Sequence, residues 1–319
     1  MEFRLRLALA LLGLALAAEA RTWTSVSGKQ IEAEYVSEAW GQVTLKTPAG
    51  EKIGIPLAKL SPADREYIQA QKLPAARTRS TAAAAESEDE SVPALAPRNG
   101  TPEVVAQMSP GTTFIRTAAG ANAVIYHVRV PPGYDPAKLA PLVVAFSSTG
   151  NGHSILRSIS ASTDKAGWIA IGCDKLMNSM DSQLADAMED EVLEDIYRNL
   201  PHDPRRVYLA GHSGGASRAY SITARRPEPF AGILAYGGWL GGPDRQKDPY
   251  CKRMAVAMVN GDQDEAANSW AEPDKKALQL RKCRVELFSF PGGHPMPNDP
   301  EVSDRAIAWL QQEWDARTR

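Results

Sequence analysis

Hydrophobic and polar positions follow two different patterns along the chain. In residues 21–71, short runs alternate apolar with polar residues and are separated by Gly, Ser and Pro. This alternation predicts half-buried β-strands at 21–25, 30–36, 42–47 and 52–57. Ser61 and Pro62 then predict a helix start, because Ser is a favoured N-cap and Pro a favoured first helical residue. We expect a small barrel-like β module closed by one helix.

From about residue 109 the pattern changes to apolar runs that alternate with segments of helical periodicity. Near-continuous apolar strands joined by helices predict an α/β fold, a mostly parallel sheet with helices on both faces. Functional side chains of such a sheet gather at the carboxyl ends of its strands. The expected strands are 123–130, 141–146, 167–173, 205–211, 231–238, 254–261 and 285–293. The expected helices are 182–199, 217–226, 265–282 and 302–314.

Residues 72–108 separate the two regions and are rich in Ala, Pro, Ser, Thr and Glu. This composition buries too little apolar surface to offset the entropy cost of ordering, so we expect a disordered linker. The predicted organisation is a signal peptide at 1–20, the β module at 21–71, the linker at 72–108 and the α/β domain at 109–319.

The first twenty residues have the features of a secretory signal. Arg4 and Arg6 precede an apolar run at 7–18, and Ala18 and Ala20 supply the small residues that a signal peptidase reads. The run is shorter than the roughly 20 residues that span a bilayer. We therefore expect cleavage before Arg21, a secreted or periplasmic protein and no stable membrane insertion; a short N-terminal anchor is the alternative.

Composition and charge limit the classes of partner and cofactor that are expected. The 319 residues are 43% hydrophobic, enough for a sizeable core, and carry a net charge of -2. With a pI near 6.3, nothing in the charge favours nucleic acid as a partner. No metal-ligand spacing or phosphate-binding motif is present, so no cofactor is expected.

Three cysteines are present, at positions 173, 251 and 283. Cys251 and Cys283 each precede an apolar run, so parallel neighbouring strands would bring them to one edge of the sheet, within bridging distance. Because an exported protein meets an oxidising compartment, we predict a Cys251–Cys283 disulfide. Cys173 is expected to be a small buried residue.

The segment YLAGHSGGASRAY contains the most informative motif. Ser213 lies in Gly211-His-Ser-Gly-Gly215, after an apolar strand and before a helical pattern. G-x-S-x-G in this strand–turn–helix context is typical of a nucleophile held on a strained turn. Gly214, at the helix start, would then direct its N–H toward an oxyanion.

A nucleophilic serine needs a base, and His294 is the best placed of the five histidines. It follows the last strand on a loop at the carboxyl edge, where Ser213 is also expected. His127 lies inside an early strand, and His202 precedes a strand at the opposite edge of the predicted sheet, so neither is expected near Ser213. His212 should pack around the turn. His153 follows an earlier strand at the correct edge, so it is a candidate pocket residue and the rival base.

An acid should orient the base, and two acids end the strand at 254–261. Asp262 or Asp264 can fill this role, and the other can cap the following helix. Either choice gives the order Ser, Asp, His that is typical of α/β-hydrolases.

Four motifs extend this likeness: VPPGYDP, GHSGG, NG-x-x-D and GGH-x-x-P. Together they resemble the α/β-hydrolase superfamily, and most of all secreted esterases of the feruloyl esterase and polyhydroxyalkanoate depolymerase type. In that family the acid stands three residues after the glycine, which implies Asp264. Relatives have His-Gly after the first central strand, whereas this chain has a Phe-Ser-Ser-Thr-Gly run, so the second oxyanion donor would be the N–H of Ser148 or Thr149. Trp239, after another strand, is a plausible pocket wall.

The N-terminal region carries an ordered set of residues: Arg21-Thr-Trp-Thr-Ser25, Gly28-Lys29, Ile31-Glu-Ala33, Val43-Thr-Leu45, Ile55-Pro-Leu57, Leu60-Ser61, Asp64 and Tyr67-Ile68. This set resembles SLA-one homology domain one, an SH3-like protein-interaction module that in eukaryotes recognises Asn-Pro-Phe-x-Asp peptides. The resemblance implies a protein- or surface-binding role for residues 21–71.

Two functions follow from the sequence. The first is a secreted serine hydrolase that cleaves carboxylic esters with Ser213, Asp264 and His294. The alternative is a catalytically degenerate hydrolase scaffold that acts as a binding or adaptor protein through its N-terminal module. The three residue types of the triad favour the first, and the altered oxyanion loop favours the second.

Overall fold

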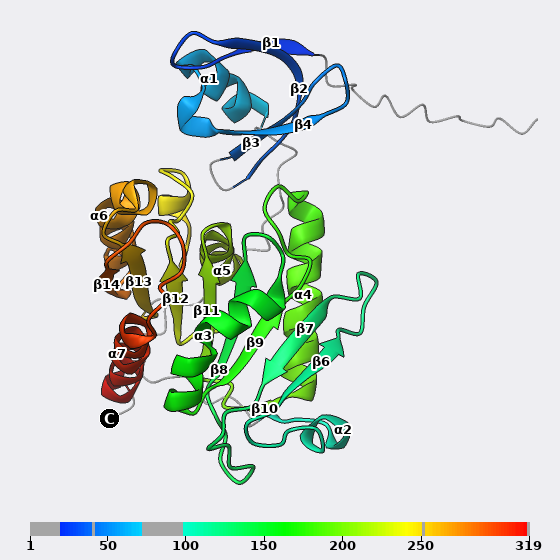
Figure 1. The fold of residues 1–319 in the computed structure, drawn as a ribbon, viewed down its shortest axis with the longest axis vertical. Helices are drawn as coiled ribbons and strands as arrows, with labels where there is room; N and C mark the ends of the chain where they lie inside the picture. Colours follow the sequence, from blue (N-terminus) through cyan, green and yellow to red (C-terminus); the bar gives the residue numbers. More distant parts are fainter. Residues whose placement is uncertain (1–19, 40–41, 72–97, 251–252, 318–319) are drawn as a thin grey trace, which may run out of the picture. The chain divides into compact units, whose positions relative to one another are not determined.

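The computed structural model describes residues 20–39, 42–71, 98–250 and 253–317, which form two compact units (Figure 1). One unit lies within residues 20–71 and the other within residues 98–317. Each unit has its own buried apolar core. No helix in these described ranges combines the length and apolar character needed to cross a membrane.

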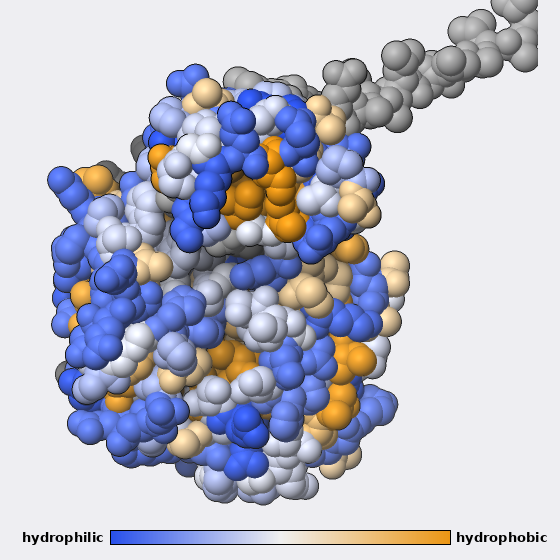
Figure 2. Space-filling view, turned by 45° about the horizontal axis from the view of Figure 1, so that its top comes forward, coloured by the Kyte–Doolittle hydropathy of each residue, from blue (hydrophilic) through white to orange (hydrophobic). Residues whose placement is uncertain are grey.

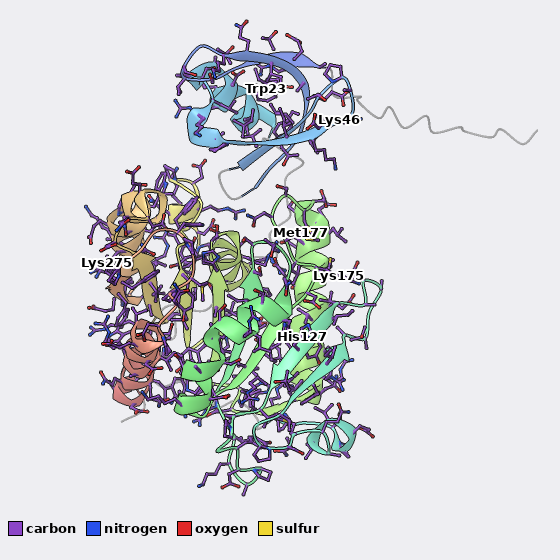
Figure 3. The ribbon with its side chains drawn as sticks, in the orientation of Figure 1. Trp23, Lys46, His127, Lys175, Met177 and Lys275 are labelled. Carbon is purple, nitrogen blue, oxygen red and sulfur yellow. The ribbon has the colours of Figure 1, made fainter. Side chains whose placement is uncertain are left out.

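The N-terminal unit is a four-stranded sheet in the order β1-β2-β3-β4, followed by a short 3-10 helix and α1. The antiparallel β1–β2 and β3–β4 pairs and an isolated Ser25–Leu60 bridge hold it together. Trp23 is 1% exposed at the centre of its core (Figure 3). The elements are β1 (Arg21–Thr24), β2 (Gln30–Ala39), β3 (Gln42–Lys46), β4 (Lys52–Pro56), η1 (Leu57–Lys59) and α1 (Pro62–Gln71).

The predicted helix start in this unit is confirmed, and it also connects α1 to β1. Ser61 Oγ accepts the N–H of Asp64 at 3.2 Å, as an N-cap does. The Asp64 carboxylate in turn accepts the Arg21 guanidinium at 2.8 Å and the Thr24 N–H at 2.7 Å. Arg21 also lies over the Tyr67 ring, 3.9 Å from its centroid. One buried carboxylate therefore joins the first strand to the helix.

The C-terminal unit is built on an eight-stranded sheet in the order β14-β13-β12-β11-β8-β9-β7-β6. The strands from β14 to β9 run parallel, and β7 and β6 are antiparallel to their neighbours. The predicted α/β fold class is confirmed, and the strand order is that of the α/β-hydrolase fold. The strands are β6 (Thr113–Thr117), β7 (Ile125–Arg129), β8 (Leu142–Ser147), β9 (Ile169–Cys173), β11 (Val207–His212), β12 (Gly232–Tyr236), β13 (Ala255–Gly261) and β14 (Arg284–Phe290).

Helices cover both faces of this sheet (Figure 1). Buried residues of α4, α5 and α6 pack on one face, and those of α3 and α7 pack on the other. The helices are α3 (Gly152–Ala166), α4 (Ser182–Asn199), α5 (Gly214–Arg225), α6 (Glu265–Gln279) and α7 (Glu301–Arg317). A short 3-10 helix, η2 (Arg245–Lys247), follows β12.

Three segments differ from the sequence-based expectations. Residues 98–105 were expected in the linker, yet they form β5 (Arg98–Asn99) and α2 (Pro102–Val105), and β5 pairs with β10 (Pro201–His202). The edge strand β6 and the whole of α3 were not predicted. The remaining linker, residues 72–97, and the predicted signal peptide up to residue 19 lie outside the described residues.

The predicted disulfide stays a prediction, because Cys251 lies outside the described residues. Its geometric premise holds, since β13 and β14 are adjacent and parallel. Cys283 is buried just before β14, and Cys173 is fully buried at the end of β9.

Candidate active site

Ser213 lies on a sharp turn between β11 and α5. Its φ of 56° and ψ of −124° are strained for a residue with a side chain, and its N–H donates to the Tyr236 carbonyl at 2.8 Å. The flanking glycines are required by close packing. A Cβ on Gly211 would lie 2.2 Å from the carbonyl carbon of Gly215, and one on Gly215 would lie 2.0 Å from the Phe146 oxygen. The sequence therefore folds into the tight turn that its motif predicts.

The structure brings Ser213, His294 and Asp264 together in a hydrogen-bonded chain. His294 Nε2 lies 2.9 Å from Ser213 Oγ, and His294 Nδ1 lies 2.7 Å from Asp264 Oδ2. With Nδ1–H donated to the carboxylate, Nε2 accepts the serine hydroxyl proton. The Asp264 side chain is 3% exposed and the His294 side chain 42% exposed. The acid is thus buried, while the base is open to solvent and to a substrate.

The two acids left open by the sequence have separate positions. Asp264 contacts His294 with Oδ2 and accepts the Ala267 N–H with Oδ1 at 3.1 Å, so it is also the N-cap of α6. Asp262 instead accepts the Gly292 N–H at 2.9 Å on the loop before His294. A single residue therefore fills both roles that the sequence had divided between two, and Asp262 supports the loop.

His212 supports the base from the position next to the nucleophile. Its Nε2 lies 2.7 Å from the backbone oxygen of His294, and the two rings are 5.0 Å apart. Burial lowers the pKa of His212, so the ring is neutral near pH 7 and donates Nε2–H to this carbonyl. The sequence predicted only that His212 would pack around the turn.

Gly237, in the segment after β12, borders the triad, a position that sequence reasoning missed. A Cβ on Gly237, whose φ is +54°, would lie 3.1 Å from Asp264 Oδ2 and 3.3 Å from His294 Nδ1. The half-buried Trp239 follows two residues later, and its carbonyl accepts the Ser217 hydroxyl at 2.7 Å. The Gly-Gly pair before Trp239 was the available sequence signal. Trp239 stays a candidate pocket wall.

The candidate oxyanion donors are not equivalent. Gly214 begins α5, where helix N–H groups lack partners within the helix. The Thr149 N–H donates to Ser147 Oγ at 3.2 Å, and the two side-chain hydroxyls lie 2.9 Å apart. The Ser148 carbonyl accepts the Asn178 N–H at 2.9 Å. Thr149 is therefore engaged within its own loop, which makes it the weaker of the two loop candidates.

His153 is not in the hydrogen-bonded chain of the triad. It is exposed in the first turn of α3, with its ring 5.6 Å from that of His127. It lines a depression together with Arg129 on β7 and Arg157 on α3. The rival base of the sequence prediction thus pairs with a different histidine. This position of His153 differs from the prediction because His153 lies on α3, an unpredicted helix that begins directly after the β8 loop.

Metal-ligating side chains do not gather in the described part of the chain. No group of three or more His, Cys, Asp or Glu side chains there could hold a metal ion. The arrangement around Ser213 offers nucleophile, base and acid chemistry from side chains alone.

Residues 15–73 match the family model of SLA1 homology domain 1. No curated protein matches the chain.

Among solved structures, the chain is similar to a dienelactone hydrolase from Anabaena variabilis, with 17% identity, a TM-score of 0.49, and 63% of this chain and 95% of that chain covered. It is also similar to an S-formylglutathione hydrolase from Agrobacterium tumefaciens, with 14% identity, a TM-score of 0.47 and coverage of 64% and 94%. A third similar structure is the fluorophosphonate-binding serine hydrolase F of Staphylococcus aureus, with 14% identity and a TM-score of 0.47. The match covers 63% of this chain and 99% of that chain.

Proposed function

We propose that the chain is a serine hydrolase that cleaves carboxylic esters through an acyl-enzyme. The observation that carries this proposal is the chain of contacts from Ser213 Oγ to His294 Nε2 at 2.9 Å and from His294 Nδ1 to Asp264 at 2.7 Å. Such a chain, on a strained turn at the carboxyl end of a central strand, is the arrangement that activates a serine.

In the proposed reaction, Ser213 Oγ attacks the ester carbonyl carbon while His294 Nε2 takes the hydroxyl proton. Asp264 holds the imidazole and stabilises its positive charge. The tetrahedral intermediate places its negative oxygen near the Gly214 N–H. Collapse breaks the bond to the alcohol, which leaves with the proton from His294. Water then repeats the sequence on the acyl-enzyme and releases the acid.

The test is hydrolysis of nitrophenyl acetate by the wild-type protein and by Ser213→Ala. We expect a loss of several orders of magnitude in kcat. Ser158→Ala, at an exposed position of α3, is the matched control and should keep wild-type rates. Equal rates for Ser213→Ala and wild type would overturn the proposal. Feruloyl and 3-hydroxyalkanoate esters should then be compared, because the sequence resembles esterases of those classes.

We propose that residues 21–71 bind a protein or cell-surface partner. The match to SLA1 homology domain 1 supports this role, and so do apolar residues on the surface of the unit (Figure 2). Val26 and Val36 are 65% and 42% exposed there. Deletion of residues 21–71 should leave turnover of a soluble ester unchanged and should abolish co-sedimentation with isolated cell envelopes. Unchanged co-sedimentation would contradict the role.

We also propose export to the periplasm or the medium, with cleavage before Arg21. This position fits the fold, because β1 begins at Arg21 and the Arg21–Asp64 ion pair lies on the mature side of the cut. N-terminal sequencing of the protein recovered from the periplasm or medium should begin at Arg21. A protein retained in the cytoplasm with its first residues intact would disprove export.

A further inference from the structure

Of the two loop N–H groups that are candidates for the oxyanion, that of Thr149 is engaged within its own loop, which leaves Ser148 as the loop candidate. Two or more donors are usual where an acyl oxygen gains negative charge. Gly214 supplies one, whereas the Thr149 N–H already donates to Ser147 Oγ. A donor from another element would add to Gly214 and Ser148 at this site.

The side chain of Asn178 lies directly against Gly214. An ideal Cβ on Gly214 would be 1.8 Å from Asn178 Oδ1 and 2.7 Å from Asn178 Nδ2. The amide therefore fills the space that a side chain at position 214 would take. Gly214 and Asn178 are complementary, because any larger residue at 214 would displace the amide.

This amide has spare hydrogen-bonding capacity. Within residues 98–250 and 253–317, no hydrogen bond of the half-buried Asn178 side chain to another residue is found. A primary amide carries two N–H donors and one carbonyl acceptor. Because Oδ1 and Nδ2 both face Gly214, a half-turn about Cβ–Cγ exchanges the two atoms and brings the N–H donors to the position nearest Gly214.

The backbone around Asn178 is fixed by contacts to the elements that form the site. The Asn178 N–H donates to the Ser148 carbonyl at 2.9 Å, and Thr149 and Met177 form an isolated bridge. The Met177 carbonyl accepts the Arg218 guanidinium at 3.0 Å. Met177 and Lys175 lie on the loop that follows β9 (Figure 3).

Arg218 extends this support into the core. It lies on α5, five residues after Ser213, and is 1% exposed. It forms a buried ion pair with Glu189 of α4. The loop that carries Asn178 is therefore anchored to the helix that starts at the nucleophile, so its amide keeps its place relative to Gly214.

We propose that Asn178 is a catalytic residue whose side-chain N–H donates to the oxyanion beside the Gly214 N–H. This inference rests on the proposed ester hydrolysis. An uncharged amide interacts weakly with the neutral carbonyl of the substrate and more strongly with the oxygen once it carries negative charge. Its contribution should therefore appear in kcat and hardly in KM.

The decisive variants are Asn178→Ala and Asn178→Asp. Loss of one oxyanion donor costs a factor of about 10²–10³ in kcat, which we expect for Asn178→Ala on nitrophenyl acetate with KM within about twofold. Asn178→Asp keeps the shape but replaces the donor with a carboxylate, so it should be at least as slow near pH 7. If the alanine variant fails to fold, the isosteric aspartate variant decides.

Two further measurements separate catalysis from a purely structural role. Phenylboronic acid forms a tetrahedral adduct with an active serine, and its affinity should fall in Asn178→Ala by a factor similar to that in kcat/KM. Asn122→Ala makes the same chemical change at an amide that contacts Glu191, and it should keep wild-type kcat and boronate affinity.

The outcomes distinguish the two proposals. If Ser213→Ala is inactive while Asn178→Ala and Asn178→Asp keep wild-type kcat, the role of Asn178 is overturned and ester hydrolysis stands. A rise in KM alone, or unchanged boronate affinity, also overturns it. If Ser213→Ala retains full activity, the proposal of ester hydrolysis at this site is overturned, and the role of Asn178 falls with it.

Discussion

The Nε2 atom of His212 lies 2.7 Å from the backbone oxygen of His294. The residue before the nucleophile thereby holds the loop that carries the base. Because Ser213 and His212 are adjacent, this bond fixes the serine and the histidine to the same end of β11. The spacing of nucleophile and base thus depends on more than their mutual hydrogen bond.

Replacement of His212 by Phe should slow catalysis without preventing folding. Loss of one hydrogen bond that positions His294 is worth about 1 kcal/mol, or several-fold to tenfold in kcat, with little change in KM. Gln, whose amide can still donate, should recover part of the rate. Steady-state kinetics on nitrophenyl acetate checks this, and equal rates for the Phe variant and wild type would show that the bond is dispensable.

Asp264 and Asp262 should respond very differently to the same substitution. Asp264→Asn removes the charge that stabilises the imidazolium and disturbs its tautomer, so kcat/KM should fall by about three to four orders of magnitude. Asp262→Asn keeps an oxygen that accepts the Gly292 N–H, so its kcat/KM should stay within about threefold. The reverse ranking would move the acid role to Asp262.

Gly237→Ala should disturb the triad through space. The added Cβ would lie 3.1 Å from Asp264 Oδ2 and 3.3 Å from His294 Nδ1, and φ of +54° adds backbone strain of about 1–2 kcal/mol. We expect a lower melting temperature and a clear fall in kcat. Gly242→Ala is the matched control, because its φ is also positive but no atom lies within 4 Å of the new Cβ. It should lose stability and keep kcat; equal kcat losses in both variants would refute the steric explanation.

His202 should make the C-terminal unit less stable in acid. Burial lowers its pKa to about 4, whereas an unfolded histidine has a pKa of about 6.5. Between these values the unfolded chain binds one more proton, so the free energy of unfolding falls by about 1.4 kcal/mol per pH unit as pH decreases. Below about pH 4 both states are protonated and the loss is complete.

The measurement is urea denaturation at pH 7 and pH 5 for wild type and His202→Gln. The wild-type protein should lose about 2 kcal/mol more than the variant over this interval, because glutamine does not titrate. Equal losses would show that His202 does not cause the acid sensitivity.

The sequence predicted the central strands because their apolar runs are buried on both faces. β8, β9, β11, β12 and β13 are nearly all fully buried. The edge strand β6 was missed, since its residues alternate between exposed and half-buried and the strand depends on pairing with β7. α3 was missed because its sequence is rich in serine, and Asn151 caps it at a point where a loop was expected.

The triad was predictable because three motifs end strands at one edge of the sheet. The neighbours of the triad were not, because their roles depend on how separate loops pack. Nothing in the sequence near Asn178 relates it to Gly214, and only the folded β9 loop brings them together. The same holds for Gly237, whose importance comes from the position of Asp264.

Asp264 both caps α6 and orients His294, so the thermal stability of the first turn of α6 and the catalytic rate depend on the same carboxylate. One oxygen starts α6 at the Ala267 N–H, and the other holds His294. Fraying of the first turn of α6 would release the carboxylate and let the imidazole rotate while the sheet is still intact. Activity should then disappear on heating before the unit unfolds, and amide exchange at Ala267 should report the inactive population.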